Sequence, residues 1–154
     1  TTAAGKNSLA SFLTAQGNSV VVTEDCVFCS IIDGEIPGHI VHETSEVVAF
    51  LDAEPVSEGH TLVVPRRHVE TIYDAGDMEY LWREAVNVAN AIREALEPEG
   101  MNLQQNTGEA AGQEVDHLHL HLTPRYTGDE VELSYDREEL GNGEKIREEI
   151  SSCI

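Results

Sequence analysis

The sequence predicts a single α+β domain, built on a five-stranded antiparallel meander sheet with one long helix and several short helices. Short runs rich in β-branched and aromatic residues are separated by turn residues, which is typical of strands. One longer segment repeats its apolar residues every three or four positions, as an amphipathic helix does. The chain has 154 residues, of which 40% are hydrophobic, so it is long enough for one domain with its own core.

These patterns assign the elements in order. The predicted strands cover residues 40–43, 47–52, 60–65, 101–106 and 115–123. Short helices are expected over residues 26–32, 66–73 and 144–150. The long helix covers residues 76–96, and Pro98 and Gly100 end it because neither residue continues a helix well.

Acidic residues divide the chain into three parts. Residues 1–23 contain no Asp or Glu, although the whole chain has 29. We therefore expect residues 1–23 to be a flexible N-terminal extension that is foreign to the domain. The domain itself is predicted over residues 24–127, and residues 128–154 are predicted to form an acidic C-terminal tail.

The net charge excludes several classes of partner. A charge of −20 rules out a general electrostatic grip on nucleic acid or on an anionic membrane, since both need surplus cation. No apolar run approaches the roughly 18 residues of a membrane span, and no secretory segment is visible, so we expect a cytoplasmic protein. An acid excess with only two Lys is typical of a halophile, because molar salt shortens the Debye length to roughly 3 Å.

The most informative segment, residues 116–123, reads DHLHLHLT. In a strand this alternation puts His117, His119 and His121 on one face and the leucines on the other, toward the core. Two kinds of chemistry fit such a row of imidazoles. One is a metal site. The other is phosphoryl chemistry, because a neutral imidazole is a good nucleophile. An imidazole can also accept and donate protons at a pH near neutral.

This segment resembles the signature of the histidine triad (HIT) family of nucleotide hydrolases and transferases. Further motifs follow the order of that family over about residues 25–126, two thirds of the chain, and are closest to the small Hint-like proteins. They are CVFC at 26–29, IP at 36–37, AFLD at 49–52, GHTLVVP at 59–65, NTG at 106–108, GQ at 112–113 and PR at 124–125.

The resemblance implies a reaction and an assembly. His119 matches the histidine that attacks the α-phosphorus and forms a covalent nucleotidyl-histidine, while His121 and His60 assist at the phosphate. The implied enzyme cleaves phosphoanhydride or phosphoramidate bonds of small-molecule nucleotides, such as dinucleoside polyphosphates or nucleoside phosphoramidates and adenylates. Members of this type are usually homodimers, joined here through helix 76–96 and strand 101–106.

The resemblance also assigns residues to the parts of a bound nucleotide. These are Asn106 and Gln113 for phosphate, Asp52 for the ribose hydroxyls, and Phe28, Ile31, Phe50 and Leu62 for an apolar slot that holds the base. The chain departs from the pattern after Gln113, where Glu114 stands in place of a Ser that often assists the leaving group. A carboxylate cannot donate a proton unless it is protonated, so this change weighs against phosphoramidate cleavage more than against anhydride cleavage.

The cysteines raise a separate question. Nothing indicates an oxidising compartment or a thioredoxin-like setting, so a disulfide or redox role for the Cys26-x-x-Cys29 turn is not expected. A zinc site needs two more ligands. Several HIT proteins supply two histidines, which match His68 and His117, so the resemblance implies a structural Zn²⁺ rather than a catalytic one. Two thiolates would cancel the charge of the Zn²⁺ ion, and two neutral imidazoles would add none, so the site could be partly buried.

A rival interpretation is not catalytic. The same residues could form a zinc-stabilised module that binds a purine nucleotide or acts as a scaffold without turning a substrate over. A covalent nucleotidyl adduct on the protein separates the two interpretations, because only the enzyme forms one.

Overall fold

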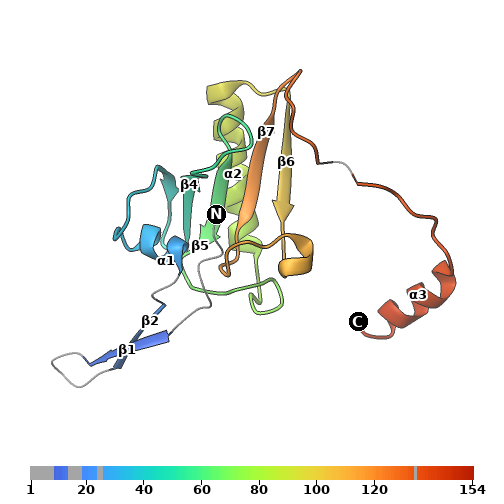
Figure 1. The fold of residues 1–154 in the computed structure, drawn as a ribbon, viewed down its shortest axis with the longest axis horizontal. Coiled ribbons are helices and arrows are strands. Elements are labelled where there is room, and N and C mark those ends of the chain that lie inside the picture. The colour runs from blue at the N-terminus through green and yellow to red at the C-terminus, as the bar shows by residue number, and fades with distance from the viewer. Residues whose placement is uncertain (1–8, 14–18, 24–25, 134) are drawn as a thin grey trace.

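The computed structural model describes residues 9–13, 19–23, 26–133 and 135–154, and it contains a five-stranded antiparallel sheet with one long helix (Figure 1). The sheet strands are β3 (Ile40–Glu43), β4 (Val47–Leu51), β5 (Thr61–Pro65), β6 (Gly100–Gln105) and β7 (Leu120–Arg125). The helices are α1 (Val27–Ile32), the long α2 (Glu79–Leu96) and α3 (Gly143–Ser151), with a 3₁₀ turn at Glu109–Ala111. This confirms the predicted fold class.

The strand order is β3-β4-β5-β7-β6, which differs from a simple meander at its last step. Helix α2 follows β5 and carries the chain across the back of the sheet, so that β6 lies two strand positions from β5 and leaves room for one strand between them. Strand β7 then returns antiparallel to β6 and fills the gap, pairing with β5 on its other side. The last strand in sequence therefore lies inside the sheet.

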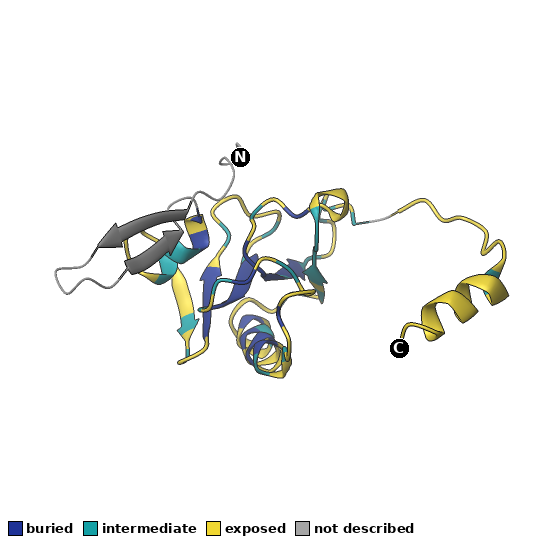
Figure 2. Cartoon of the chain, turned by 90° about the horizontal axis from the view of Figure 1, so that it is seen from below, coloured by how far each residue is buried: buried dark blue, intermediate teal, exposed yellow. Residues whose placement is uncertain are grey.

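One face of the sheet packs against α2 and forms the main core. Helix α2 buries Leu81, Ala85, Val88 and Ile92, spaced by three or four residues, against that face. The strands contribute Val47, Ala49, Val63, Leu120 and Leu122, and Leu118 joins them from the segment just before β7. Figure 2 shows the buried residues concentrated in the sheet and on the side of α2 that meets it. The leucines that alternate with the triad histidines point toward this core, as predicted, and the histidines therefore lie on the opposite face.

The triad strand begins five residues later than predicted, at Leu120. The register pairs Val63 with Leu120, so continuing it would place Leu118 opposite Pro65, which has no N–H to donate to the ladder. The Leu118 N–H instead donates to the carbonyl of Val69 at 2.7 Å. His117 and His119 therefore sit on an irregular approach to β7 rather than within it.

The predicted helix over residues 66–73 is wrong, because this segment is an irregular loop. Tertiary contacts hold it in that form. The Val69 carbonyl accepts from Leu118, the Arg67 guanidinium donates to the Ala75 carbonyl at 3.0 Å, and the ring of His68 approaches Cys29. These contacts outweigh a weak local helix propensity.

Outside the sheet, residues at the two ends adopt regular structure. Strands β1 (Leu9–Leu13) and β2 (Ser19–Thr23) pair antiparallel. Helix α3 lies at the end of an extended segment, apart from the sheet in Figure 1, and its residues are exposed apart from the half-buried Gly143. Among the described helices, none is long and apolar enough to cross a membrane. The three-part division of the chain stays a prediction.

Candidate functional site

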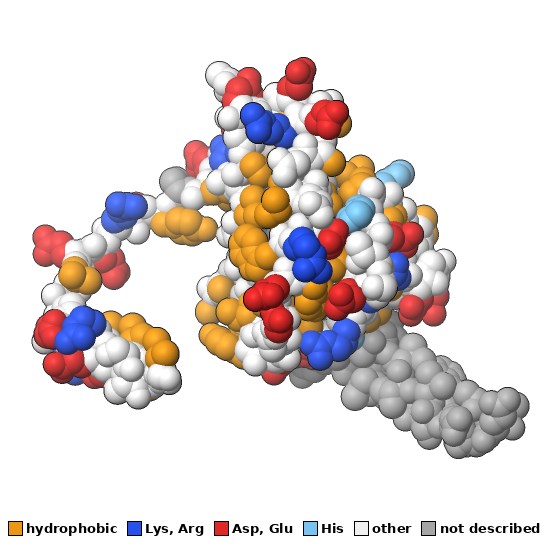
Figure 3. Space-filling view, turned by 180° about the vertical axis from the view of Figure 1, so that it is seen from behind, with side chains coloured by type: hydrophobic (Ala, Val, Ile, Leu, Met, Phe, Trp, Pro, Cys, Tyr) orange, Lys and Arg blue, Asp and Glu red, His pale blue; other side chains and the backbone are white. Residues whose placement is uncertain are grey.

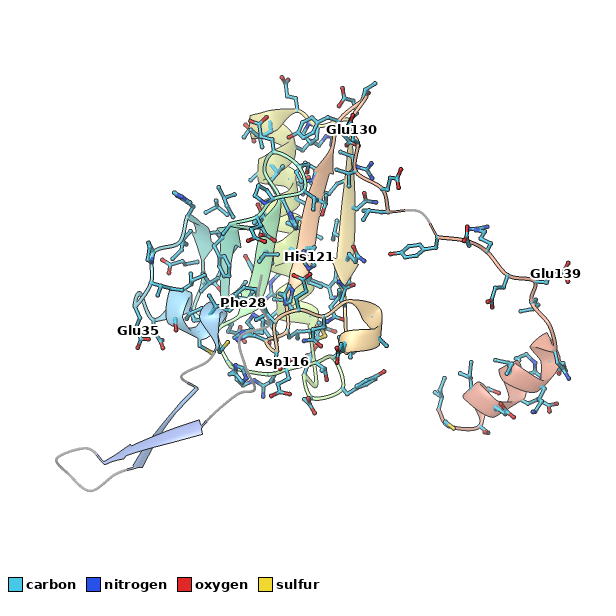
Figure 4. The ribbon with its side chains drawn as sticks, viewed as in Figure 1. Phe28, Glu35, Asp116, His121, Glu130 and Glu139 are labelled. Carbon is cyan, nitrogen blue, oxygen red and sulfur yellow. The ribbon has the colours of Figure 1, made fainter. Side chains whose placement is uncertain are left out.

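The face of the sheet opposite α2 carries the histidines and is partly covered by α1. A second apolar cluster forms there, in which Phe28 of α1 packs against Phe50 of β4 and Leu62 of β5. The Phe28 ring meets the rings of Phe50 and His119 edge-on, with centroid distances of 5.3 and 5.0 Å. Figure 4 labels Phe28 on α1 and His121 on β7, and the ring of His119 contacts both of theirs.

Four potential metal ligands converge where α1 meets the approach to β7. The Nδ1 atom of His117 lies 3.4 Å from Cys26 Sγ, 3.5 Å from Cys29 Sγ and 3.2 Å from His68 Nδ1. His68 Nδ1 is also 3.3 Å from Cys29 Sγ, and the four ligand atoms all lie within 4.8 Å of one another. These are the four residues that the resemblance implied.

The spacing fits a tetrahedral ion. With bonds of roughly 2.0 Å to nitrogen and 2.3 Å to sulfur, the edges of a zinc tetrahedron are roughly 3.3 Å between nitrogens and 3.5 Å between nitrogen and sulfur. The measured separations match these edges within a few tenths of an ångström. The Cys26–Cys29 spacing follows from α1, because the thiol of Cys26 caps the helix by accepting from the Cys29 N–H at 3.3 Å.

The chemistry of the donors fits as well. His117 Nε2 lies 2.8 Å from the Pro65 carbonyl, which only accepts, so this nitrogen carries the proton. The lone pair is then on Nδ1, which faces the cluster as a metal ligand must. Burial lowers the pKa of His117 to about 4, which keeps the imidazole neutral. The cluster of Cys26, Cys29, His68 and His117 could therefore hold a metal ion.

His119 has the opposite tautomer. Its Nδ1 lies 2.6 Å from the main-chain carbonyl of His117, so Nδ1 carries the proton and Nε2 keeps its lone pair. Burial is the main reason why the pKa of His119 lies below its ordinary value, and the negative charges of Asp52 and Glu114 oppose that effect. The result is a neutral imidazole with a fixed ring and an available nucleophilic nitrogen.

His60 and His121 form a chain whose direction is set by the backbone. The Val56 N–H donates to His60 Nδ1 at 3.2 Å, so the proton of His60 is on Nε2. That nitrogen lies 2.9 Å from His121 Nδ1 and donates to it. His121 therefore carries its own proton on Nε2, which leaves it as a neutral hydrogen-bond donor. Burial, followed by the nearby imidazoles, lowers the pKa of His121 to about 4.

A second group of potential ligands, Asp52, His60 and His121, also lies within 4.8 Å. It is a poor metal site, because His60 Nε2 bears a proton as long as Nδ1 accepts from Val56. Asp52 instead lies 3.7 Å from His60 Nε2, and its other oxygen accepts from the Glu54 N–H at 2.8 Å. This group is better described as a hydrogen bond between His60 and His121 with a carboxylate nearby.

The two amide side chains expected to bind phosphate, those of Gln113 and Asn106, have different surroundings. The Gln113 side chain is held by three main-chain groups: its oxygen accepts from Gly108, and its nitrogen donates to the carbonyls of Glu70 and Val115. Both of its N–H groups are thereby used, so Gln113 fixes the loop instead of offering a donor to phosphate. Asn106 is half-buried directly after β6, and a Cβ added to Gly112 would lie 3.8 Å from its amide nitrogen.

The four residues expected to line a base slot gather on one side of the histidines. Phe28, Phe50 and Leu62 are buried in the second apolar cluster, and Ile31 packs against it. The structure thus brings the expected slot next to His119. Sequence reasoning missed Val56, whose N–H fixes the tautomer of His60. No sequence signal reveals that contact, because it depends on how the loop before β5 folds back.

Comparison with known proteins agrees with this geometry. Residues 33–128 match the HIT domain. The chain belongs to the HIT family. Its relatives include the adenosine 5'-monophosphoramidase HNT1 of Saccharomyces cerevisiae, which is 41% identical over 118 residues, covering 75% of this chain and 73% of that protein.

Solved HIT structures share the fold. A HIT family protein from Bacillus anthracis has a TM-score of 0.78 at 37% identity, covering 85% of this chain and 98% of that one. A Zn-bound histidine triad family protein from Mycobacterium smegmatis has a TM-score of 0.65 at 34% identity, covering 84% and 97% of the two chains. The HIT domain of this chain is therefore similar both to a nucleotide-handling enzyme and to a zinc-containing structure.

Proposed function

We propose that this HIT protein, of the Hint-like branch, is a nucleotide hydrolase or nucleotidyl transferase that cleaves at the α-phosphate through a nucleotide bound covalently to His119. The observation that carries the proposal is the tautomer of His119. Its Nδ1–H is held by the His117 carbonyl, so the Nε2 lone pair is free to attack. The monophosphoramidase name of the yeast relative supports the same type of reaction.

The reaction takes two displacements at phosphorus. In the first, the Nε2 lone pair of His119 forms a bond to the α-phosphorus, and the bond to the substituent breaks with its electron pair. In the second, water attacks the same phosphorus and releases one proton to the solvent, the P–N bond breaks with its electron pair returning to Nε2, and the mononucleotide leaves while neutral His119 is regenerated. The Nε2–H of His121 donates to a phosphoryl oxygen in both steps.

The other site residues bind and orient the nucleotide. Asp52 accepts from the ribose hydroxyls, the apolar slot around Phe50 and Leu62 holds the base, and Asn106 contacts the phosphate. Candidate substrates are dinucleoside polyphosphates and nucleoside phosphoramidates or adenylates. Glu114 bears on the choice, because an amine leaving group needs a proton that a charged carboxylate cannot donate.

We infer that the metal cluster holds a structural zinc. Cys26 and Cys29 on α1 would be tied through it to His68 and His117, whose carbonyl orients His119. Zinc would supply no chemistry to the substrate. Its effect would be to keep the nucleophile in place.

We also infer a homodimer through α2 and β6. Trp82 and Val86 on α2 are 48% and 50% exposed, and Leu103 on the edge strand β6 is 38% exposed. Figure 3, which views the molecule from behind, shows hydrophobic side chains gathered on this side. A second copy would cover them and the edge of the sheet. Light scattering should report twice the chain mass, and Trp82→Asp should halve it.

The reaction is tested by trapping the intermediate. Wild type incubated briefly with an adenylated substrate and analysed without acid should gain the mass of one adenylyl group on His119. His119→Ala should bind nucleotide with little change but lose turnover by about 1000-fold or more. Turnover by His119→Ala would refute the assignment of the nucleophile. If wild type shows neither an adduct nor turnover, the protein is a nucleotide-binding or scaffolding module.

A further inference from the structure

One row of residues crosses the histidine face of the sheet from β4 to β6. The register pairs Phe50 with Leu62, Leu62 with His121, and His121 with Gln104. Residues directly opposite one another in antiparallel strands project from the same face. The row therefore runs from the base slot, through the phosphate-binding histidine, to a glutamine on the edge strand.

The spacing of this row fits an extended substrate. Neighbouring strands lie about 5 Å apart, so the row covers about 15 Å from β4 to β6. If the proposed function holds, the base lies over Phe50 and Leu62 and the α-phosphate lies at His121. A substituent on that phosphate that points away from the base must then lie over β6, beside Gln104.

We propose that Gln104 binds the group displaced from the α-phosphate and sets which leaving groups the enzyme prefers. The side chain is half-buried, and among the described residues its carboxamide has no hydrogen-bond partner. Its neighbour Gln105, by contrast, bonds to Thr107 and to the carbonyl of Asn106. The amide of Gln104 is thus available to a ligand that reaches β6.

The chemistry of the amide points to a class of leaving group. The two N–H donors of Gln104 suit the oxygens of a second phosphate without adding positive charge. A polyphosphate leaving group also extends several atoms beyond the α-phosphorus, far enough to reach β6. Ammonia released from an unsubstituted phosphoramidate is a single heavy atom and does not. Gln104 therefore favours phosphoanhydride substrates over small phosphoramidates.

The test compares two substrates in wild type and in Gln104→Leu. With a diadenosine polyphosphate, kcat/KM should fall roughly 10-fold or more, as expected for a lost hydrogen bond to a charged group. With adenosine 5'-phosphoramidate it should change less than about 2-fold. Gln104→Glu, which is isosteric but negatively charged, should lower the anhydride rate further. Asn142→Leu, which removes an exposed amide from the C-terminal segment, is the control and should change neither rate.

The outcomes separate this inference from the proposed function. Unchanged rates, or an equal loss on both substrates, would overturn the role of Gln104 and leave the proposed function standing. Wild type that cleaves only the phosphoramidate would also overturn it. Wild type that cleaves neither substrate would overturn the proposed function, and this inference with it.

Discussion

At the scale of single residues, the site is organised by main-chain groups that fix where each imidazole carries its proton. The carbonyls of Pro65 and His117 accept from His117 Nε2 and His119 Nδ1, and the Val56 N–H donates to His60. Two neighbouring triad histidines thus have opposite tautomers. One turns its lone pair to the thiols, and the other turns its lone pair toward the face where substrate would bind.

The neutral state of His121 makes stability depend on pH. In the folded protein its pKa is lowered to about 4, chiefly by burial and then by the neighbouring His119 and His60, with Asp52 opposing. The unfolded chain takes up the proton near pH 6.5, so this contribution is present above that pH and is lost as the pH falls toward 4. Between pH 7.5 and 5, the free energy of unfolding should fall by about 2 kcal/mol on this account.

Chemical denaturation at the two pH values, at constant salt, measures this effect. His121→Gln should show a smaller loss than wild type, while the exposed His39→Gln should show the same loss as wild type. An unchanged loss in His121→Gln would mean that other groups account for the acid sensitivity.

At the scale of elements, the cysteine and histidine cluster joins α1 to the segment that leads into β7. Helix α1 has only six residues, which is too short to be stable alone, so its position depends on the second apolar cluster and on this junction. The segment before β7 has no ladder partner at Pro65. A metal ion would therefore strengthen the part of the fold where regular hydrogen bonding ends.

Metal removal should expose that dependence. Purified protein should contain about one zinc per chain, and a Cys26→Ser/Cys29→Ser double variant should contain none. Its Tm should fall by roughly 10 °C or more, because binding energy of a structural metal is also folding energy. Cys153→Ser, which changes an exposed cysteine, should retain both the metal and the Tm. Elemental analysis and calorimetry check both points.

The loop before β5 depends on Gly59. Its φ is +87°, and an added Cβ would lie 2.5 Å from Leu96 Cδ1 of α2. Gly59→Ala should therefore lower the free energy of unfolding by about 1–3 kcal/mol, chiefly through backbone strain, because the end of the Leu96 side chain can shift at a smaller cost. It should also lower kcat, because His60 is the next residue.

Gly76→Ala provides a matched control. Gly76 has a φ of +66° but nothing within 4 Å of an added Cβ, so only the backbone strain remains. Its cost should be about 1–2 kcal/mol, with no change in kcat. Equal losses of stability in the two variants would show that the contact with Leu96 is unimportant.

At the scale of the whole molecule, the chain has a net charge of −20, and none of the residues proposed to bind the nucleotide is a Lys or Arg. The phosphate would be held by neutral imidazoles and an amide, which add no charge of either sign. We infer that the acidic surface is an adaptation to high salt, in which both self-repulsion and repulsion of a nucleotide are screened.

Raising KCl from 0.1 to about 3 M shortens the Debye length from about 10 Å to a few ångströms and should raise the Tm by several degrees. It should also lower the KM for an anionic nucleotide. Sucrose at matched osmolality, which does not screen charge, separates the two effects, because it should not lower the KM. A KM that is independent of KCl would contradict the proposed electrostatic effect.

The sequence was a reliable guide where periodicity was strong. The apolar spacing in the segment 79–96 and the alternation of leucines and histidines depend only on the repeat of a helix or strand, so both were predicted. The loop at 66–73 was not, because its contacts with Cys29 and Leu118 come from segments far away in the sequence. The same is true of the position of β7 between β5 and β6, which depends on the crossover of α2.

The sequence by itself determined the fold class, the two faces of the triad segment and the kinds of side chain that gather there, because these follow from local repeats and from motifs in order. Only the tertiary structure decided which nitrogen of each histidine is free, that Gln113 braces a loop, and that Gln104 continues the row of Phe50, Leu62 and His121. These properties depend on atoms brought together from distant segments, and a hydrogen bond exists only once both of its partners have been placed.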